Sequence, residues 1–139
     1  MTSANEELIG KFFQAYGQRD LDAIRQVMDE KVRWTFPGTH PLGGIKSGVE
    51  EVVALFDGMG AIMGASKVRN ERLVGGASEE YVIECQHIST DREDGANLDQ
   101  QMCVLWRFED GKIVEGRHFV ADQRALEEFF SRVSTDGKS

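Results

Sequence analysis

Four strand-like segments follow one another in the second half of the chain, and they limit the possible folds more than any other feature. They are rich in apolar and β-branched residues and cover 67–74, 80–90, 97–108 and 112–121. Gly-Gly at 75–76, Arg-Glu-Asp-Gly at 92–95 and Glu-Asp-Gly at 109–111 supply the turns. Strands with such short connections pair as antiparallel neighbours. We therefore expect an antiparallel sheet here.

Two helices and a strand are expected before this sheet. Ser3 and Glu6 have the spacing of a capping box, an apolar stripe follows them, and Gly17 ends the first helix. Asp20 is the expected cap of a short second helix. Residues 32–36 then alternate in polarity and predict a strand.

A loop and two further helices complete the predicted order. Residues 37–48 contain both prolines and several glycines, which indicates a long loop. Ser47 and Glu50 form a second capping box that opens the third helix, and the last helix follows Asp122. This order predicts a single α+β domain over 1–133, with a flexible tail at 134–139. A curved sheet wrapped by helices leaves a concave space for a small ligand.

Composition restricts the partners. The net charge of −8 repels polyphosphates, so we expect no nucleic acid partner. No apolar run approaches the roughly 20 residues of a membrane span. The first residues lack the basic and apolar regions of a signal peptide, so a cytoplasmic protein is expected. The three histidines lack metal-ligand spacing, and we expect neither a metal nor another cofactor.

Both cysteines, Cys85 and Cys103, lie inside apolar runs without a metal-binding spacing. We expect buried free thiols. If their two strands form a hairpin, the thiols could lie opposite one another, although a cytoplasmic setting disfavours a disulfide.

Four stretches point to a family: FFQAYGQRDLDAI, VRWTFPGTHPLGGIKSGVEEVVALF, VLWRFEDGKIVEGRHF and ADQRALEEFF. Together they resemble the SnoaL-like branch of the nuclear transport factor 2-like superfamily, which also contains ketosteroid isomerases and limonene epoxide hydrolases. The resemblance implies a cone-shaped, mostly antiparallel sheet wrapped by the N-terminal and central helices. It also implies proton-transfer chemistry without a cofactor and a homodimer that pairs through the sheet.

The residues that serve ketosteroid isomerases are absent. The positions that match the isomerase tyrosine, base and oxyanion acid are occupied by Phe12, Phe36 and Val104. The paired aspartates and arginine of limonene epoxide hydrolases also have no counterpart, because no Arg-x-Asp falls within a predicted strand. SnoaL-like cyclases use an aspartate near the end of the last strand as acid/base, and Asp122 matches that region.

Asp122 and His118 are the candidate catalytic residues. Desolvation in an apolar cone would raise the pKa of an aspartate and suit it to proton transfer, but Asp is also a favoured helix cap. His118 alternates with Gly116 and Val120, so these three should share one side of the last strand. His118 is either a proton shuttle in the pocket or a packed histidine.

Candidate substrate-binding residues surround this pair. Gly116 would leave room beside the imidazole, and His40 could cover the cone from a lid-like loop or be an exposed loop residue. Glu84 and Gln86 face the cone if Cys85 lies opposite Cys103, whereas a one-residue slip turns them outward. The remaining candidates form an apolar lining, with the core as the alternative assignment: Phe12, Trp34, Phe36, Met102, Val104 and Trp106.

These residues favour a cofactor-independent cyclase, isomerase or dehydratase that acts on a mid-sized apolar carbonyl compound. Two alternatives stay open. A cone without placed acids can bind a hydrophobic ligand without catalysis, and an exposed sheet can serve mainly as a dimer surface.

Overall fold

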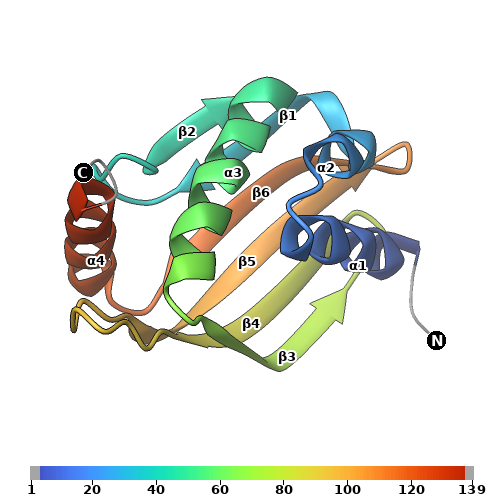
Figure 1. Cartoon of the computed structure of the whole chain (residues 1–139). Coiled ribbons are helices and arrows are strands. Elements are labelled where there is room, and N and C mark those ends of the chain that lie inside the picture. Colours follow the sequence, from blue (N-terminus) through green and yellow to red (C-terminus); the bar gives the residue numbers. More distant parts are fainter. Residues whose placement is uncertain (1–3, 137–139) are drawn as a thin grey trace.

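Six strands lie side by side in one curved sheet (Figure 1). They are β1 (Met28–Phe36), β2 (Gly44–Ser47), β3 (Arg69–Ala77), β4 (Tyr81–Ser89), β5 (Asp99–Glu109) and β6 (Lys112–Val120). Their order is β2-β1-β6-β5-β4-β3, with β1 parallel to β6 and every other pair antiparallel. This computed structural model describes residues 4–136, so the predicted capping role of Ser3 lies outside the described residues.

Four helices accompany the sheet: α1 (Ala4–Gly17), α2 (Leu21–Val27), α3 (Val49–Ala65) and α4 (Gln123–Asp136). The first three lie over one face of the sheet, which we call the inner face, and α4 stands at one end (Figure 1). Asp20 caps α2 as predicted, because its carboxylate accepts a hydrogen bond from Ala23 N–H at 3.1 Å. Arg25 of α2 pairs with Glu50 of α3 at 3.0 Å, which ties the two helices together.

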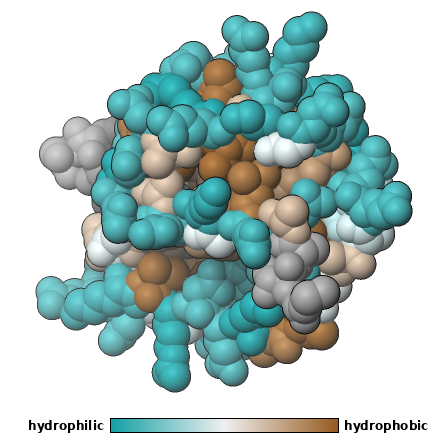
Figure 2. All heavy atoms as spheres, turned by 90° about the vertical axis from the view of Figure 1, so that its right-hand side faces the viewer, coloured by the Kyte–Doolittle hydropathy of each residue, from teal (hydrophilic) through white to brown (hydrophobic). Residues whose placement is uncertain are grey.

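The inner face and the helices share one apolar core. Val32, Trp34 and Phe36 of β1 alternate into it, and α3 adds residues at helical spacing, among them Val52 and Phe56. Hydrophilic side chains cover most of the side that carries α1 and α2, with hydrophobic atoms gathered between them (Figure 2). No helix within residues 4–136 combines the length and apolarity needed to cross a membrane.

The α+β fold class is confirmed, and of the two registers left open for β4 and β5, the structure has the one in which Cys85 lies opposite Cys103. The predicted turn at Gly75 and Gly76 is wrong. Both glycines lie inside β3, and the chain turns toward β4 only after Ala77. The Arg72 guanidinium lies over Gly75 beside a register shift, in space that a Cβ would otherwise occupy.

Three further expectations about the elements need correction. The predicted loop contains β2, which pairs with β1 because its backbone groups find partners there. Ser47 ends β2 and does not cap α3, whose N-cap is Gly48. The last helix continues through the start of the predicted tail to Asp136, and residues 137–139 lie outside the described part.

Candidate functional site

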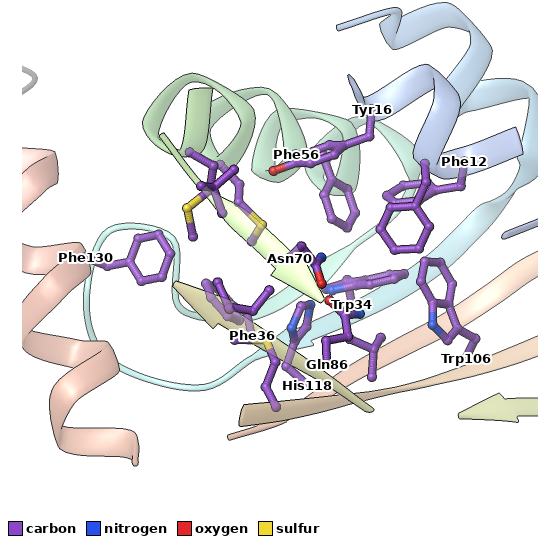
Figure 3. A pocket seen from close by; sticks show the side chains of 17 residues that line it. Phe12, Tyr16, Trp34, Phe36, Phe56, Asn70, Gln86, Trp106, His118 and Phe130 are labelled. Carbon is purple, nitrogen blue, oxygen red and sulfur yellow. The ribbon is translucent and has the colours of Figure 1, made fainter. Parts of the chain in front are cut away.

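A cavity of about 280 Å³ lies between the inner face of the sheet and the helices (Figure 3). Its walls are mostly aromatic and aliphatic. The lining residues are Phe12, Phe13, Tyr16, Trp34, Phe36, Phe56, Met59, Met63, Val68, Asn70, Gln86, Ile88, Met102, Val104, Trp106, His118 and Phe130. Apolar cavities of ~150 Å³ accept benzene, so this one is large enough for a compound of about two rings.

Strand alternation and helical spacing place these side chains. On β5, Met102, Val104 and Trp106 are buried while the residues between them turn outward. On α1, Phe12 and Tyr16 are one helical turn apart and point toward the cavity (Figure 3). The six apolar residues predicted from the sequence all line the cavity, including those at the three isomerase positions.

Trp34 lies at the centre of an aromatic cluster. Its ring centroid is 4.9 Å from that of Phe56 and 5.1 Å from that of Trp106, both in edge-on geometry. The ring passes directly over Gly116, where a Cβ would meet three of its carbon atoms at less than 3.0 Å. Gly116 therefore leaves room for Trp34 and not for the imidazole, which corrects the predicted substrate-binding role. Edge-on contacts of this kind between aromatic rings stabilise the packing of Trp34 in the cavity wall.

His118 extends from β6 into the cavity beside this cluster (Figure 3). Its ring lies 4.7 Å from that of Phe36 and 5.8 Å from that of Trp34. Both ring nitrogens are buried and have no hydrogen-bond partner among the described residues, although the residue as a whole stays partly accessible. Burial lowers the pKa of His118 to about 4, so the imidazole is neutral near pH 7.

The other polar groups of the cavity are also uncharged. The indole N–H groups of Trp34 and Trp106 are buried, and within the described chain they donate to nothing. Gln86 is buried on β4 and lines the cavity with an uncharged carboxamide. Asn70 and Val68 are exposed and mark the side of the cavity that faces solvent. Burial raises the pKa of Tyr16 to about 12, which keeps its phenol protonated.

Unpartnered buried groups of this kind are costly. Each buried donor or acceptor without a partner costs ~1–3 kcal/mol. Natural proteins retain such groups mainly where water, an ion or a ligand satisfies them. A neutral imidazole presents one donor and one acceptor, and an indole presents one donor. The cavity therefore suits a ligand with an apolar body and at least one hydrogen-bond acceptor.

Asp122 does not join this group. Its side chain is exposed and accepts a hydrogen bond from Ala125 N–H at 3.0 Å, so it caps α4. Its backbone is fixed by the buried Gln100, whose carboxamide donates to Asp122 O at 3.0 Å and accepts from Asp122 N–H at 3.1 Å. The candidate acid/base role of Asp122 placed its carboxylate in the pocket, and this placement is wrong: α4 begins at the next residue, and the carboxylate caps that helix in an exposed position.

His40 is a structural residue of the loop before β2. It is 4 % exposed, its ring stacks on Phe130 at 5.0 Å, and Nε2–H donates to Pro37 O at 3.0 Å. Nδ1 accepts from Leu42 N–H at 3.3 Å. Burial lowers the pKa of His40, which agrees with this neutral tautomer. His40 does not line the cavity, and the alternative of an exposed loop residue is wrong because its side chain is buried.

Glu84 and Gln86 both lie on the inner side of β4, but only Gln86 lines the cavity. Gln86 lies opposite Met102 and lines the cavity. Glu84 lies opposite Val104 but pairs with Arg72 at 3.4 Å, away from the cavity lining. Burial raises the pKa of Glu84, and the Arg72 guanidinium opposes that change. The predicted substrate contact of Glu84 is thus replaced by an ion pair at the β3–β4 side.

Several lining residues were missed because their elements read as ordinary core. Phe56, Met59 and Met63 follow the helical spacing of α3, and that pattern alone cannot separate a cavity wall from a filled core. The sequence indicated a lining role for Asn70 only weakly, because it is a single polar residue near the start of a predicted strand. Within residues 4–136, no three His, Cys, Asp or Glu side chains gather as a metal site would require.

Several solved structures share this arrangement of strands and helices, and they show the fold class. Bal32a, from a soil-derived mobile gene cassette, superimposes with a TM-score of 0.80 at 25% identity, covering 93% of this chain and 98% of Bal32a. A nuclear transport factor 2-like protein of Burkholderia pseudomallei gives 0.75 at 22% identity, with coverage of 93% and 98%. TerC, co-crystallised with polyporic acid, gives 0.75 at 21% identity, with coverage of 92% and 98%. The fold is therefore nuclear transport factor 2-like.

Sequence comparison narrows this class. The SnoaL-like domain family matches residues 9–116, so the chain belongs to the SnoaL-like family, as the resemblance predicted. An uncharacterised protein of Mycobacterium tuberculosis is 31% identical over 129 residues, which cover 92% of this chain and 97% of that protein.

Proposed function

We propose that the protein binds a neutral, mostly apolar small molecule of about two rings with a carbonyl or similar acceptor oxygen. The observation that carries this proposal is the set of neutral, unpartnered polar groups in an aromatic cavity: His118, Trp34 and Trp106. A charged ligand would lose its hydration without meeting a counter-charge, because no lining residue is acidic or basic apart from the neutral imidazole. TerC, which shares the fold, was crystallised with a small organic molecule.

Binding without catalysis is preferred because of the state of His118. A general base works best when its pKa lies near the working pH. With a pKa of about 4, His118 is a weak base at neutral pH, and Asp122 lies outside the cavity. The imidazole can therefore orient an acceptor oxygen more readily than it can remove a proton.

Three matched probes test this proposal: naphthalene, 2-acetylnaphthalene and 2-naphthoate. The chain has two tryptophans, and both lie in the cavity wall, so quenching of their fluorescence reports occupancy. The ketone should bind best and the carboxylate worst. His118→Leu should weaken ketone binding about tenfold, the value of one lost hydrogen bond, and should leave naphthalene binding unchanged. Equal affinity for all three probes, or saturable binding of none, would refute the proposal.

A second candidate, proton-transfer catalysis, is supported by the unpartnered imidazole itself. A neutral His118 beside a bound ketone could accept an α-proton if binding raised its pKa. Exchange of the methyl protons of 2-acetylnaphthalene in deuterated buffer tests this directly. Exchange that the wild type accelerates and His118→Gln does not would place catalysis ahead of simple binding.

The homodimer implied by the resemblance is also a proposal. The face of the sheet opposite the helices, here the outer face, exposes Ile45, Val74, Ile83 and Phe119 by 40–61 %. An apolar surface of this kind is typical of an interface. Sedimentation equilibrium should give a dimer that Phe119→Lys converts to a monomer, whereas a wild-type monomer at high concentration would exclude this interface.

A further inference from the structure

The two cysteines form a matched pair on the outer face. Cys85 of β4 lies directly opposite Cys103 of β5, and their Sγ atoms are 2.7 Å apart. In the isolated chain both are reduced and half-buried, so a molecule as small as a peroxide can reach them there. Neither thiol lines the cavity described above, and neither contributes to the proposed binding function.

Opposed residues on β4 and β5 alternate between two kinds of pair, and Cys85 and Cys103 form the kind whose side chains lie closer. Thr90 N–H donates to Leu98 O at 2.9 Å, and Phe108 N–H donates to Glu80 O at 2.9 Å, so these two opposed pairs are hydrogen-bonded pairs. Cys85 and Cys103 lie five positions from each, with no register shift along the ladder. Hydrogen-bonded and non-hydrogen-bonded pairs alternate, so the cysteines form a non-hydrogen-bonded pair.

Non-hydrogen-bonded pairs are the closer kind. Their Cα atoms lie ~4.5 Å apart, which falls inside the range that a disulfide can span. Flanking residues do not compete for the thiols, because Ile83 and Phe119 are apolar and no metal-binding cluster occurs among the described residues. The pair is thus held ready for a bond that needs little backbone movement.

We propose that Cys85 and Cys103 are a reversible oxidation site that closes an intramolecular disulfide in reaction with hydrogen peroxide. Cys85 Sγ attacks one peroxide oxygen, the O–O bond breaks, and a sulfenic acid and one water form. Cys103 Sγ then attacks the sulfenic sulfur, the S–S bond forms, and the second water leaves with the remaining thiol proton. Two electrons pass from the sulfurs to the peroxide.

The two thiols have different roles in this reaction. The hydrogen bond to Cys85 and burial raise the pKa of Cys103 to about 11, so Cys103 keeps its proton. Either sulfur can donate in the hydrogen bond between the two thiols, and a thiolate is the form that attacks a peroxide. Gln86 and Met102, the next residues on each strand, face the cavity, so the cross-link would lie directly behind the cavity wall.

The test treats the folded protein with limiting hydrogen peroxide and follows intact mass and thiol alkylation. The wild type should lose two hydrogen atoms and both alkylatable thiols, and dithiothreitol should restore them. Cys85→Ser and Cys103→Ser should instead gain oxygen or form covalent dimers. The double variant Cys85→Ser/Ile83→Cys keeps two thiols but places them diagonally, roughly 7–8 Å apart, and should close at least about tenfold more slowly.

Three results would overturn the proposal. The wild type could stay reduced under a dose that oxidises a small-molecule dithiol, both in dilute solution and at concentrations that favour a dimer. Its intact mass could increase by one or more oxygen atoms without the loss of two hydrogen atoms that a disulfide requires. The diagonal variant could also close as fast as the wild type, which would mean that chain flexibility and not the strand register brings the thiols together. None of these outcomes depends on ligand binding in the cavity.

Discussion

Replacing Gly116 with alanine should destabilise the protein because the new methyl group would occupy the space of the Trp34 ring. A Cβ at this position would lie less than 3.0 Å from three indole carbons. Trp34 is 1 % exposed and packs against Phe56, Trp106 and His118 with ring centroids 4.9–5.8 Å away, so a shift of its ring away from Gly116 disturbs these contacts. Overpacking of this kind costs ~1–3 kcal/mol, and the rigid wall favours the upper value.

The measurement is urea unfolding followed by far-ultraviolet circular dichroism, because tryptophan fluorescence would itself change. Gly10→Ala is the matched control: it lies in α1, where an added Cβ would meet no atom within 4 Å, and should stabilise by ~0.5–1 kcal/mol. Trp34→Leu should remove most of the penalty of Gly116→Ala, giving a coupling energy of ~1–3 kcal/mol. A Gly116→Ala variant within ~0.5 kcal/mol of the wild type, or a coupling near zero, would refute the reasoning.

Three further predictions concern His118 and Asp122, which follow Gly116 in the chain. Burial lowers the pKa of His118 to about 4 in the folded protein. Between pH 6.5 and 4 the unfolded chain therefore binds a proton that the folded chain does not. The free energy of unfolding should fall by ~3 kcal/mol as the pH drops through this window. His118→Gln should flatten that fall in pH-dependent unfolding, and an unchanged slope would show that the imidazole is not buried in the neutral form. Asp122→Ala should cost ~1 kcal/mol through loss of the α4 cap, while Asp122→Asn should be nearly neutral. In an NMR titration the His118 signal should be the same in Asp122→Asn and in the wild type, and a shift would restore the carboxylate–imidazole pair.

The architecture was accessible from the sequence because it depends on short-range periodicity. Alternation on β5 and β6 and helical spacing on α1 and α3 determine which side chains turn inward, whatever the details of packing. The turn after β4 suggested that Cys85 and Cys103 could lie opposite one another but left a one-residue slip open, because the register of a hairpin is set by the exact geometry of its connection. The β2 strand was missed because its four residues carry no alternating pattern of burial and depend on β1 for their hydrogen bonds.

The site was less accessible, because it depends on where separate elements meet. The sequence by itself determined that His118 shares one side of its strand with Gly116 and Val120, since strand parity is a local property, and the family resemblance assigned that side to the pocket. Only the tertiary structure decided that Gln100 turns Asp122 away into a helix cap, and that Gly116 accommodates a tryptophan from β1, a strand far earlier in the chain. Steric exclusion and hydrogen-bond satisfaction between distant segments make those choices, and neither has a period that a sequence can display.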